Sequence, residues 1–551
     1  MSVTASRAGR PEVVPWPDEL AERYVARGYW EQRPLGAYLD DAAAGRPGTI
    51  CLVDGDVSLT FAELVSRVDG AAQRLHGLGL RAGDRVIVQL PNCWEFVVIA
   101  LACFRSGVVP VMALPAHRRQ ELTAIARLTE ARALLVAGTV RGFDHEQLAH
   151  EVAAAVPGLR HVAVTGRRNR PDSLDLVALC APAGDTSARA AAPDPGDVAL
   201  FLLSGGTTGR PKLIPRTHND YAYMMRTAAR ICGAGPDTVY LAVLPLAHGY
   251  PMAGPGILGT LVSGGRIVIL ASPAPQRALA AIAEHRVTMT SLVPAAVIRW
   301  LDHLAGSPAA DLDSLDLVQV AGSRLPDEVA ARVTPALGAR LQQVYGMAEG
   351  LLCMTRPGDP DAVVHHTQGR PICPDDELLL VDEDGTPVPI GEPGILLTRG
   401  PYTPLGYYRE PELTAAAYPP GGWYRTGDVV RLRADGNLVI EGRDKDLINR
   451  GGEKIAAEEV ENFAHQLATV SQAAAVAMPD PELGEAVCLY VVPRAGSTVT
   501  LAQVRDVMRE AGVAAFKLPE RLELVDSLPV TAIGKVDKKA LRADIARRRH
   551  P

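Results

Sequence analysis

A loop rich in glycine and threonine is the segment of this chain best suited to chemistry. Residues 204–212 read SGGTTGRPK and follow the apolar run 198–203. Glycines let successive backbone N–H groups converge on one anion, and hydroxyl and ammonium side chains add further donors. The segment predicts a phosphate-binding loop, with an ordinary turn as the alternative. Its expected phosphate contacts are Ser204, Gly205, Gly206, Thr207, Thr208, Gly209 and Lys212.

The loop does not match the Walker pattern, which requires Gly, four residues and then Gly-Lys-Ser/Thr. Five positions after Gly205 the chain has Arg210, and Gly209 is followed by Arg-Pro. A P-loop kinase is therefore disfavoured.

Alternating segments around this loop predict α/β architecture with largely parallel sheets. The β-branched runs 85–90 and 265–270 alternate with alanine-rich helical stretches such as 276–285. Residues 165–196 are expected to form a surface connection. After about residue 395 the strands become shorter, and residues 434–437 carry a hairpin signal.

A domain boundary is expected at the charged, glycine-flanked stretch 442–446. This stretch separates the hairpin from a helix beginning near Ala456, and its composition suits a hinge. The chain of 551 residues exceeds one hydrophobic core, which agrees with two or more domains.

Composition narrows the class of protein. The chain is 47% apolar, and its net charge of −7 provides no basic field for nucleic acid or an acidic membrane surface. The eight cysteines include no Cys-x-x-Cys pair, which favours reduced thiols that serve as packing residues over a zinc site or a disulfide framework. The apolar run 96–104 is far shorter than the roughly 20 residues that span a bilayer, and the N-terminus has no apolar signal core. We expect a cytoplasmic protein without nucleic-acid or membrane partners, in which 96–104 is a buried helix.

Five further motifs accompany the phosphate loop. They are YGMAE at 345–349, YRTGD at 424–428, GRDKD at 442–446, GGEK at 451–454 and GK at 534–535. In this order and spacing the set resembles the adenylate-forming superfamily of acyl-CoA synthetases, peptide-synthetase adenylation domains and luciferases. The resemblance spans nearly the whole chain.

Within that superfamily the chain is most similar to stand-alone aryl-acid adenylating enzymes of the 2,3-dihydroxybenzoate–AMP ligase type. The segments that carry this similarity are 218–221, 244–251, 342–350 and 448–454. The resemblance implies an α/β fold with a large N-terminal domain of layered α/β subdomains and a small barrel-like subdomain, plus a small, mobile α+β C-terminal domain. The implied boundaries are 1–443 for the N-terminal core, 444–445 for the hinge and 446–551 for the C-terminal domain.

The resemblance also implies a two-step reaction. A carboxylic acid and ATP form an acyl-AMP and pyrophosphate, and the acyl group then passes to a phosphopantetheine thiol. In the first step two anions approach each other, so cations and N–H donors are needed around the phosphates.

Residue roles follow from the matched motifs. Tyr345 is expected to stack on adenine, Asp428 to accept hydrogen bonds from the ribose hydroxyls, and Arg443 to donate to the ribose or phosphate. Glu349 is expected to hold Mg²⁺, a hard cation suited to carboxylate and phosphate oxygens. Asp428 taken alone could instead cap the following turn. The expected ATP or AMP contacts further include Gly322, Ser323, Arg324, Val344 and Gly346.

Lys535 is expected to bridge the substrate carboxylate and the α-phosphate, and His248 is expected among the catalytic residues. Without the resemblance, Lys535 would be interpreted as a solvated surface lysine. Because Lys535 lies in the small domain, the site must form between domains, and Lys445 corresponds to the pivot of the family's domain rotation. One departure is Ala348, where many superfamily members have a threonine whose hydroxyl meets the α-phosphate. The aryl-acid branch often carries alanine there.

The acid-binding segment favours an aromatic acid. Amino-acid adenylation domains place an aspartate near His248 to pair the substrate ammonium, and residues 244–256 contain none. Dihydroxybenzoate enzymes typically read His-Asn-Tyr-Pro here, with a serine five positions after the asparagine, whereas this chain has Gly249 and Gly254. Both departures remove volume and polar groups. The hypothesis is a bicyclic or bulky acid, such as quinoline- or quinoxaline-2-carboxylate, in a pocket comprising Gly249, Tyr250, Gly254, Gly322, Met347 and Leu352.

Two questions stay open at the level of sequence. A glycine with positive φ and a neighbouring side chain that refills the cavity would remove the basis for a bicyclic acid and leave salicylate or 2,3-dihydroxybenzoate. No carrier segment follows Lys535, so the expected acceptor is a separate aryl carrier protein of nonribosomal peptide or siderophore biosynthesis, with free CoA as the rival. An aryl-CoA ligase would share every core motif, whereas a silent nucleotide-binding protein would be expected to lose one.

Overall fold

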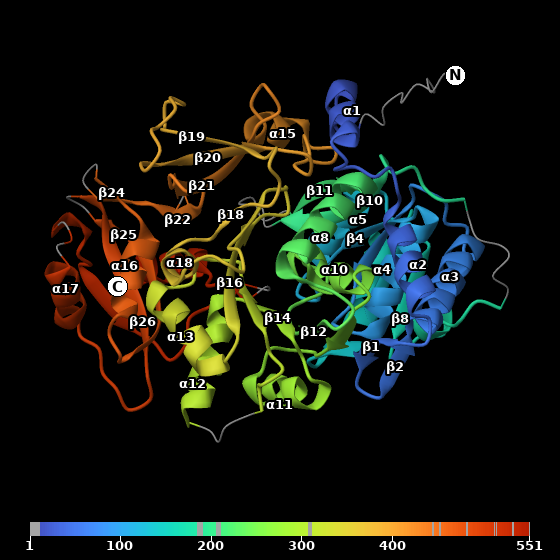
Figure 1. Ribbon diagram of the computed structural model, residues 1–551, viewed down its shortest axis with the longest axis horizontal. Helices are drawn as coiled ribbons and strands as arrows, with labels where there is room; N and C mark the ends of the chain where they lie inside the picture. Colours follow the sequence, from blue (N-terminus) through green and yellow to red (C-terminus); the bar gives the residue numbers. More distant parts are fainter. Residues whose placement is uncertain are drawn as a thin grey trace.

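The computed structural model describes residues 12–184, 191–204, 211–306, 311–443, 446–450, 453–480, 483–511, 513, 515–531 and 534–549. Two large sheets form the N-terminal part, and an antiparallel sheet and a C-terminal domain adjoin them (Figure 1).

The first large sheet is seven-stranded, in the order β11-β10-β4-β3-β5-β8-β9. Its neighbours pair in parallel except β10 and β11, an antiparallel pair that carries the predicted phosphate loop between its strands. The strands are β3 (Arg85–Gln89), β4 (Val109–Met112), β5 (Ala133–Ala137), β8 (His161–Thr165), β9 (Leu174–Asp175), β10 (Val198–Ser204) and β11 (Lys212–Thr217).

The second large sheet is nine-stranded, in the order β18-β17-β16-β15-β14-β12-β13-β1-β2. Its central strands are parallel, and antiparallel strands complete both edges. The strands are β1 (Ile50–Asp54), β2 (Val57–Thr60), β12 (Val239–Ala242), β13 (Arg266–Ile269), β14 (Met289–Leu292), β15 (Leu317–Val320), β16 (Arg340–Gly346), β17 (Leu352–Met354) and β18 (Arg370–Pro371). A short hairpin, β6 (Thr139–Val140) and β7 (Phe143–Asp144), lies outside both sheets.

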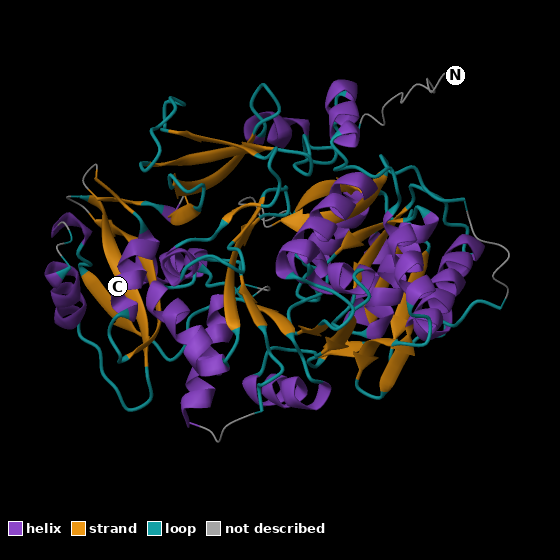
Figure 2. Ribbon diagram, in the orientation of Figure 1, coloured by secondary structure: helices purple, strands orange, loops and turns teal. Residues whose placement is uncertain are grey.

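Helices cover these sheets (Figure 2). The predicted buried helix is α4, which is buried along nearly its whole length, as expected for a run without polar residues at a helical period. The helices are α1 (Asp18–Ala26), α2 (Leu35–Gly45), α3 (Phe61–Gly77), α4 (Trp94–Ser106), α5 (Arg119–Thr129), α6 (His145–Ala155), α7 (Leu176–Leu179), α8 (His218–Cys232), α9 (Gly249–Ala253), α10 (Gly256–Val262), α11 (Pro275–His285), α12 (Pro294–Gly306), α13 (Asp327–Leu337), α14 (Asp361–His366) and α15 (Pro411–Ala417).

The third part is an antiparallel sheet of β19 (Glu377–Val381), β20 (Pro393–Arg399), β21 (Tyr424–Leu432) and β22 (Leu438–Arg443). The predicted hairpin joins β21 to β22. In its turn Gly436 has φ +80°, and the N–H of Asn437 donates to Asp435 Oδ1 at 3.1 Å. The resemblance implied a small barrel-like subdomain, whereas the described residues here form a four-stranded sheet in the order β19-β20-β21-β22, in which β19 and β22 are not paired.

The C-terminal domain is α+β. Its core lies between a mixed sheet and the helices, and the predicted helix near Ala456 is α16. Its elements are β23 (Ile448–Arg450), β24 (Glu453–Ile455), α16 (Ala457–His465), β25 (Val470–Asp480), β26 (Gly484–Pro493), α17 (Leu501–Glu510), the 3₁₀ turn Ala515–Lys517, β27 (Arg521–Leu524) and α18 (Lys538–Arg549). The α/β class and the division into a large and a small domain are confirmed.

One expectation about local structure was wrong in part. The segment 165–196 is not entirely a surface connection, because β9 and α7 lie within it. Asp175 caps α7 by accepting a hydrogen bond from the Ala178 N–H at 3.2 Å, and Leu176 is fully buried. The apolar positions 176 and 179 outweigh the polar composition of the flanking residues.

All eight cysteines lie within the described residues as free thiols, and all except the half-buried Cys93 are buried. No helix in the described part of the chain combines the length and apolar character that crossing a bilayer would need.

Candidate active site

Hydrogen bonds join both ends of the predicted phosphate loop to the predicted metal ligand. Ser204, the last residue of β10, donates through Oγ to Glu349 Oε1 at 3.1 Å. The hydroxyl of Tyr407 donates to the same oxygen at 3.2 Å, and Lys212 Nζ donates to that hydroxyl at 3.3 Å. Three sequence-predicted residues therefore lie together, and Tyr407 connects them.

Sequence analysis missed Tyr407. Its ring lies beneath Lys212 Nζ, which is 4.6 Å from the ring centroid. Burial and the nearby Glu349 carboxylate raise the pKa of Tyr407, so its hydroxyl stays protonated and donates to Glu349. The available signal was the Gly-Tyr-Tyr triplet at 406–408, which lies outside every motif used above.

Arg216 supports the segment that carries Glu349, and sequence analysis missed it too. Its fully buried guanidinium pairs with Asp220 at 2.7 Å and donates to the Ala348 carbonyl oxygen at 3.1 Å. Asp220 also accepts a hydrogen bond from the Thr217 N–H at 2.6 Å, which starts α8. The strand after the phosphate loop thus holds the Tyr345–Glu349 segment through its backbone.

The predicted adenine and ribose contacts lie side by side. The hydroxyl of Tyr345, on β16, donates to Asp428 Oδ2 on β21 at 2.7 Å, and both residues are buried. Asp428 is opposite Arg443 in the β21–β22 register. The N–H of Asp428 donates to Thr426 Oγ1 at 3.0 Å, which orients the strand end. A fixed carboxylate beside an aromatic ring is the arrangement expected for a ribose and a base.

Lys535 reaches the large domain across the domain boundary. A Cβ placed on Gly322 would lie 3.1 Å from Lys535 Cε, and Gly322 has φ +99°. Gly322 therefore permits both the backbone conformation and the close approach of the lysine. Thr531 and Lys535 are joined by two hydrogen bonds: the Thr531 N–H donates to the Lys535 carbonyl at 2.7 Å, and Thr531 Oγ1 accepts from the Lys535 N–H at 3.2 Å.

His248 lies in the same site as Lys535. It caps α9, with Nδ1 accepting a hydrogen bond from the Tyr250 N–H at 3.3 Å, so its proton resides on Nε2. Burial, with a smaller effect of the Lys535 charge, lowers the pKa of His248 to about 4. The imidazole is neutral at neutral pH and presents a donor rather than a second positive charge.

Gly249 and Gly254, the two departures from the dihydroxybenzoate pattern in the predicted acid pocket, have different surroundings. Neither has positive φ, so neither is required by backbone conformation. A Cβ on Gly249 would lie 3.2 Å from Leu202 Cδ1, and a Cβ on Gly254 would lie 3.3 Å from the Tyr250 carbonyl oxygen. Leu202 and Tyr250 therefore occupy part of the space that the sequence analysis assigned to substrate.

A buried polar network fixes the wall of this pocket. Gln319 Nε2 donates to the Gly254 carbonyl at 3.2 Å and to Gln342 Oε1 at 2.9 Å, and Ser291 Oγ donates to Gln319 Oε1 at 2.8 Å. The hydroxyl oxygen of Tyr250 is shielded from solvent. Burial raises the pKa of Tyr250, whereas a side-chain interaction with Ser291 of the same network acts in the opposite direction.

The other predicted contacts are divided between the site and the scaffold. Arg324 donates to Asp327 Oδ1 at 3.0 Å and to the Ile440 carbonyl at 3.1 Å, so its guanidinium binds protein groups here. Val344 and Leu352 are buried, Met347 is half-buried, and Ser323 and Gly346 are exposed. The residues that lie outside the described part are Gly205, Gly206, Thr207, Thr208, Gly209 and Lys445, together with the side chain of Arg443.

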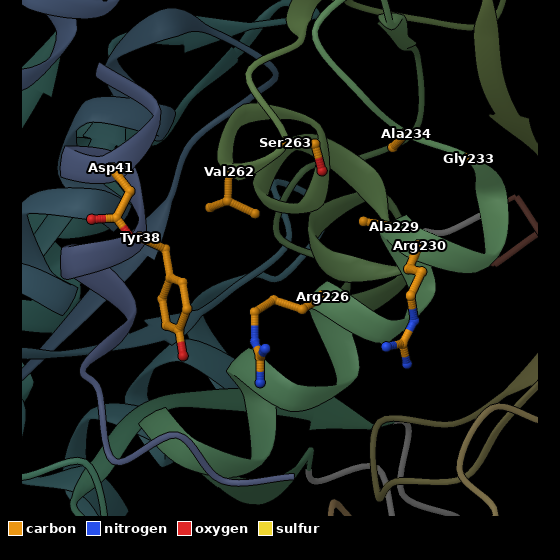
Figure 3. Close-up of a pocket in the computed structure, with 9 residues that line it drawn as sticks. All are labelled: Tyr38, Asp41, Arg226, Ala229, Arg230, Gly233, Ala234, Val262 and Ser263. Atoms are coloured by element: carbon orange, nitrogen blue, oxygen red, sulfur yellow. The ribbon is translucent and has the colours of Figure 1, made fainter. Parts of the chain in front are cut away.

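A surface hollow of about 390 Å³ lies elsewhere, between α2, α8 and α10 (Figure 3). Tyr38, Asp41, Arg226 and Arg230 line it, and no predicted site residue does. Arg226 is paired with Glu31 and Asp41 with Arg33 at 2.8 Å, so the charges at this hollow are largely satisfied by the protein.

Comparisons with known proteins agree with this geometry. Residues 39–408 match the model of the AMP-binding enzyme family, and residues 459–535 match that of the AMP-binding enzyme C-terminal domain. The chain belongs to the AMP-binding enzyme family. Its similarity to stand-alone aryl-acid adenylating enzymes makes it an adenylate-forming, acid–thiol ligase of the aryl-acid branch.

Three relatives show the range of that branch. A 2-hydroxy-7-methoxy-5-methyl-1-naphthoate–CoA ligase of Streptomyces carzinostaticus is 58% identical over 99% of each chain. A salicylyl-CoA synthase / salicylate adenylyltransferase of a Streptomyces species is 54% identical over 98% of each chain. A 2,3-dihydroxybenzoate–AMP ligase of Bacillus subtilis is 45% identical over 97% of each chain.

A solved structure extends the comparison to the fold. The anthranilate–CoA ligase AuaEII, in complex with anthranoyl-AMP, superposes with a TM-score of 0.85 at 25% identity, covering 93% of this chain and 97% of that one. Both the large and the small domain are included at this coverage.

Proposed function

We propose that this enzyme joins an aromatic carboxylic acid to AMP and then transfers the aryl group to the phosphopantetheine thiol of a separate carrier protein in nonribosomal peptide or siderophore biosynthesis. The observation that carries the proposal is the approach of Lys535 to Gly322, in the same site as His248. The ammonium group of Lys535 contributes to the lowered pKa of His248, so a cation of the small domain and a neutral imidazole of the large one lie near each other.

In the first step a carboxylate oxygen of the acid attacks the α-phosphorus of ATP, and the bond to pyrophosphate breaks. Lys535 offsets the charge of the two approaching anions, which is greatest in the transition state. Ser204 and Lys212 donate to the outer phosphates, and Asp428 holds the ribose. In the second step the thiol sulfur attacks the aryl carbonyl carbon, loses its proton, and releases AMP.

Mg²⁺ fits the donors around Glu349. Within the described residues there is no cluster of three or more His, Cys, Asp or Glu side chains that could cage a metal. Mg²⁺ commonly takes one or two carboxylates and completes its shell with phosphate oxygens and water. When bound, the ion would neutralise phosphate charge. Glu349, oriented by Ser204 and Tyr407, is the carboxylate proposed to hold it.

We propose a bicyclic or bulkily substituted acid as the substrate. Gly249 and Gly254 provide neither an ortho-hydroxyl contact nor side-chain volume, and the 58% identical relative is named for a bicyclic naphthoate. The Leu202 side chain narrows the space beside Gly249, and a change of its rotamer would change the space available to the acid. The relatives named for salicylate and 2,3-dihydroxybenzoate support the smaller acids as the alternative.

The acceptor has two candidates. Transfer to a carrier protein is inferred from the resemblance to the 2,3-dihydroxybenzoate–AMP ligase type, and one relative has that name. Two relatives of higher identity have names that include CoA products instead. We propose the carrier thiol and keep free CoA as the alternative.

ATP–pyrophosphate exchange with a panel of acids tests the first step. The panel comprises salicylate, 2,3-dihydroxybenzoate, anthranilate, 3-hydroxypicolinate, a 2-hydroxy-1-naphthoate and quinoline- and quinoxaline-2-carboxylates. The expected result is strongest exchange with a bicyclic acid. A clear preference for a hydroxybenzoate would show that Leu202 and Tyr250 fill the pocket, and thioester formation with CoA as efficient as with aryl carrier proteins would overturn the proposed acceptor.

A further inference from the structure

The large and small domains meet at a second place, away from the Lys535 loop. Asp302, on α12, accepts a hydrogen bond from Ser471 Oγ on β25 at 3.3 Å through Oδ2. Its other oxygen, Oδ1, accepts from the guanidinium of Arg494, which follows β26. One carboxylate of the large domain is therefore clamped by two side chains of the small domain.

Arg494 is itself held in place within the small domain. Its Nε donates to the Ala468 carbonyl at 3.0 Å, and its N–H donates to the Thr469 carbonyl at 2.9 Å. Because these bonds fix Arg494 within the small domain, its contact with Asp302 constrains the position of the whole small domain and not only that of one side chain.

Helix α12 connects this clamp to the active site. It begins at Pro294, directly after Val293, whose Cγ2 lies 3.7 Å from the Cβ position of Gly534. Asp302 lies eight positions after Pro294, about 12 Å along a helix that rises about 1.5 Å per residue. In Figure 1 the C-terminal domain, in red, lies beside α12 and α13. The small domain thus lies close to the large one at the start of α12 and is hydrogen-bonded to it at Asp302.

The Asp302 carboxylate lies in a positively charged part of the domain interface. His465, at the end of α16, has its pKa lowered to about 4 by burial and by the charges of Arg494 and Arg332. Arg332 belongs to the large domain and Arg494 to the small one, so two like charges approach across the interface. Asp302 offsets them.

We propose that Asp302 is a positioning residue for the adenylation step: its clamp to Arg494 and Ser471 holds the small domain where Lys535 reaches the nucleotide site. This inference rests on the role of Lys535 in the proposed function. Rotation of the small domain separates Asp302 from both partners, so the clamp favours the first half-reaction over the second.

The test compares the two half-reactions in the full-length enzyme with Asp302→Asn. Because the side chains are about a third exposed, we expect ATP–pyrophosphate exchange to fall about three- to fivefold. Single-turnover transfer from supplied aryl-AMP to the thiol is expected to be unchanged or faster. Ser471→Ala, which leaves the ion pair, is expected to act in the same direction to a smaller extent.

Asp316→Asn is the matched control, because it removes a carboxylate paired with Arg340 at 2.6 Å on the exposed surface of the large domain. An equal fall of both half-reactions, or unchanged pyrophosphate exchange in Asp302→Asn, would overturn the inference. Amide hydrogen exchange of segment 466–472 is an independent readout and is expected to quicken in Asp302→Asn but not in the control. The wild-type enzyme could activate no aromatic acid while hydrogen exchange of segment 466–472 still quickens in Asp302→Asn. That result would refute the proposed function but support the contact of Asp302 with the small domain.

Discussion

Tyr407 connects residues that lie far apart in the sequence, and it shows how single side chains organise this site. It donates to Glu349 and accepts from Lys212, so the carboxylate and the ammonium share one hydroxyl. A phenol can do both at once because its oxygen is donor and acceptor. Ser204 and Lys212, which flank the predicted phosphate loop, are thereby connected to the proposed Mg²⁺ ligand.

At the same scale, Gly249 is the position best placed to test the choice of acid. Gly249→Asn would add a polar side chain whose Cβ lies 3.2 Å from Leu202 Cδ1. If a bicyclic acid uses this space, kcat/KM for that acid should fall about 10- to 100-fold, while hydroxybenzoates should lose less or gain. Steady-state kinetics on both acid classes measures the ratio.

The control for this substitution is Gly158→Ala, because an added Cβ there meets nothing within 4 Å and the backbone has no positive φ. An unchanged preference in Gly249→Asn would show that the acid does not reach this position.

At the scale of elements, α8 anchors the phosphate-loop hairpin to the rest of the large domain. Its first residue, His218, is buried, and its Nδ1 accepts a hydrogen bond from the Leu35 N–H at the start of α2, at 3.1 Å. Asp220, in the same turn, binds Arg216 of β11. Two helices and one strand are thus connected through the first turn of α8.

Burial lowers the pKa of His218 from 6.5 to about 4, which makes stability depend on pH. The unfolded chain takes up a proton near pH 6.5 and the folded chain does not, so this contribution is present above pH 6.5 and is lost as pH falls toward 4. Between pH 7 and pH 5 it amounts to about 2 kcal/mol. The variant His218→Asn keeps an amide oxygen that can accept a hydrogen bond from the Leu35 N–H. Its free energy of unfolding, measured with urea, should therefore fall less between pH 7 and pH 5 than that of the wild type.

His285→Asn, in the last turn of α11, is the control for general effects of removing an imidazole. An equal pH dependence in wild type and His218→Asn would contradict the assignment of this loss to His218.

At the scale of the whole molecule, Lys535 of the small domain lies close to Gly322 of the large one. In the proposed mechanism neither domain holds the complete site. There the lysine serves the first step, where two anions approach, and not attack by a thiol on an uncharged carbonyl carbon.

Lys535→Ala is therefore expected to lower ATP–pyrophosphate exchange by about 100-fold or more while sparing transfer from supplied aryl-AMP. Lys539→Ala, on the exposed side of α18, removes the same charge four residues away and should leave both steps intact. Comparable loss of both half-reactions in Lys535→Ala would argue against a role specific to adenylation.

The sequence by itself determined the fold class, the two-domain organisation, the helices α4, α11 and α16, and membership of the adenylate-forming superfamily. These features depend on local periodicity and on ordered motifs, which are readable along the chain. Individual residue roles remained predictions, since no motif reports what a side chain touches.

Only the tertiary structure decided which distant residues meet. The roles of Tyr407, Arg216 and Asp302 could not be assigned from local sequence, because their partners lie up to 195 residues away in the chain. The space beside Gly249, at the start of α9, is likewise decided by Leu202 of β10. Packing between elements is a property of the folded chain, so contacts that depend on it can be derived only from the fold.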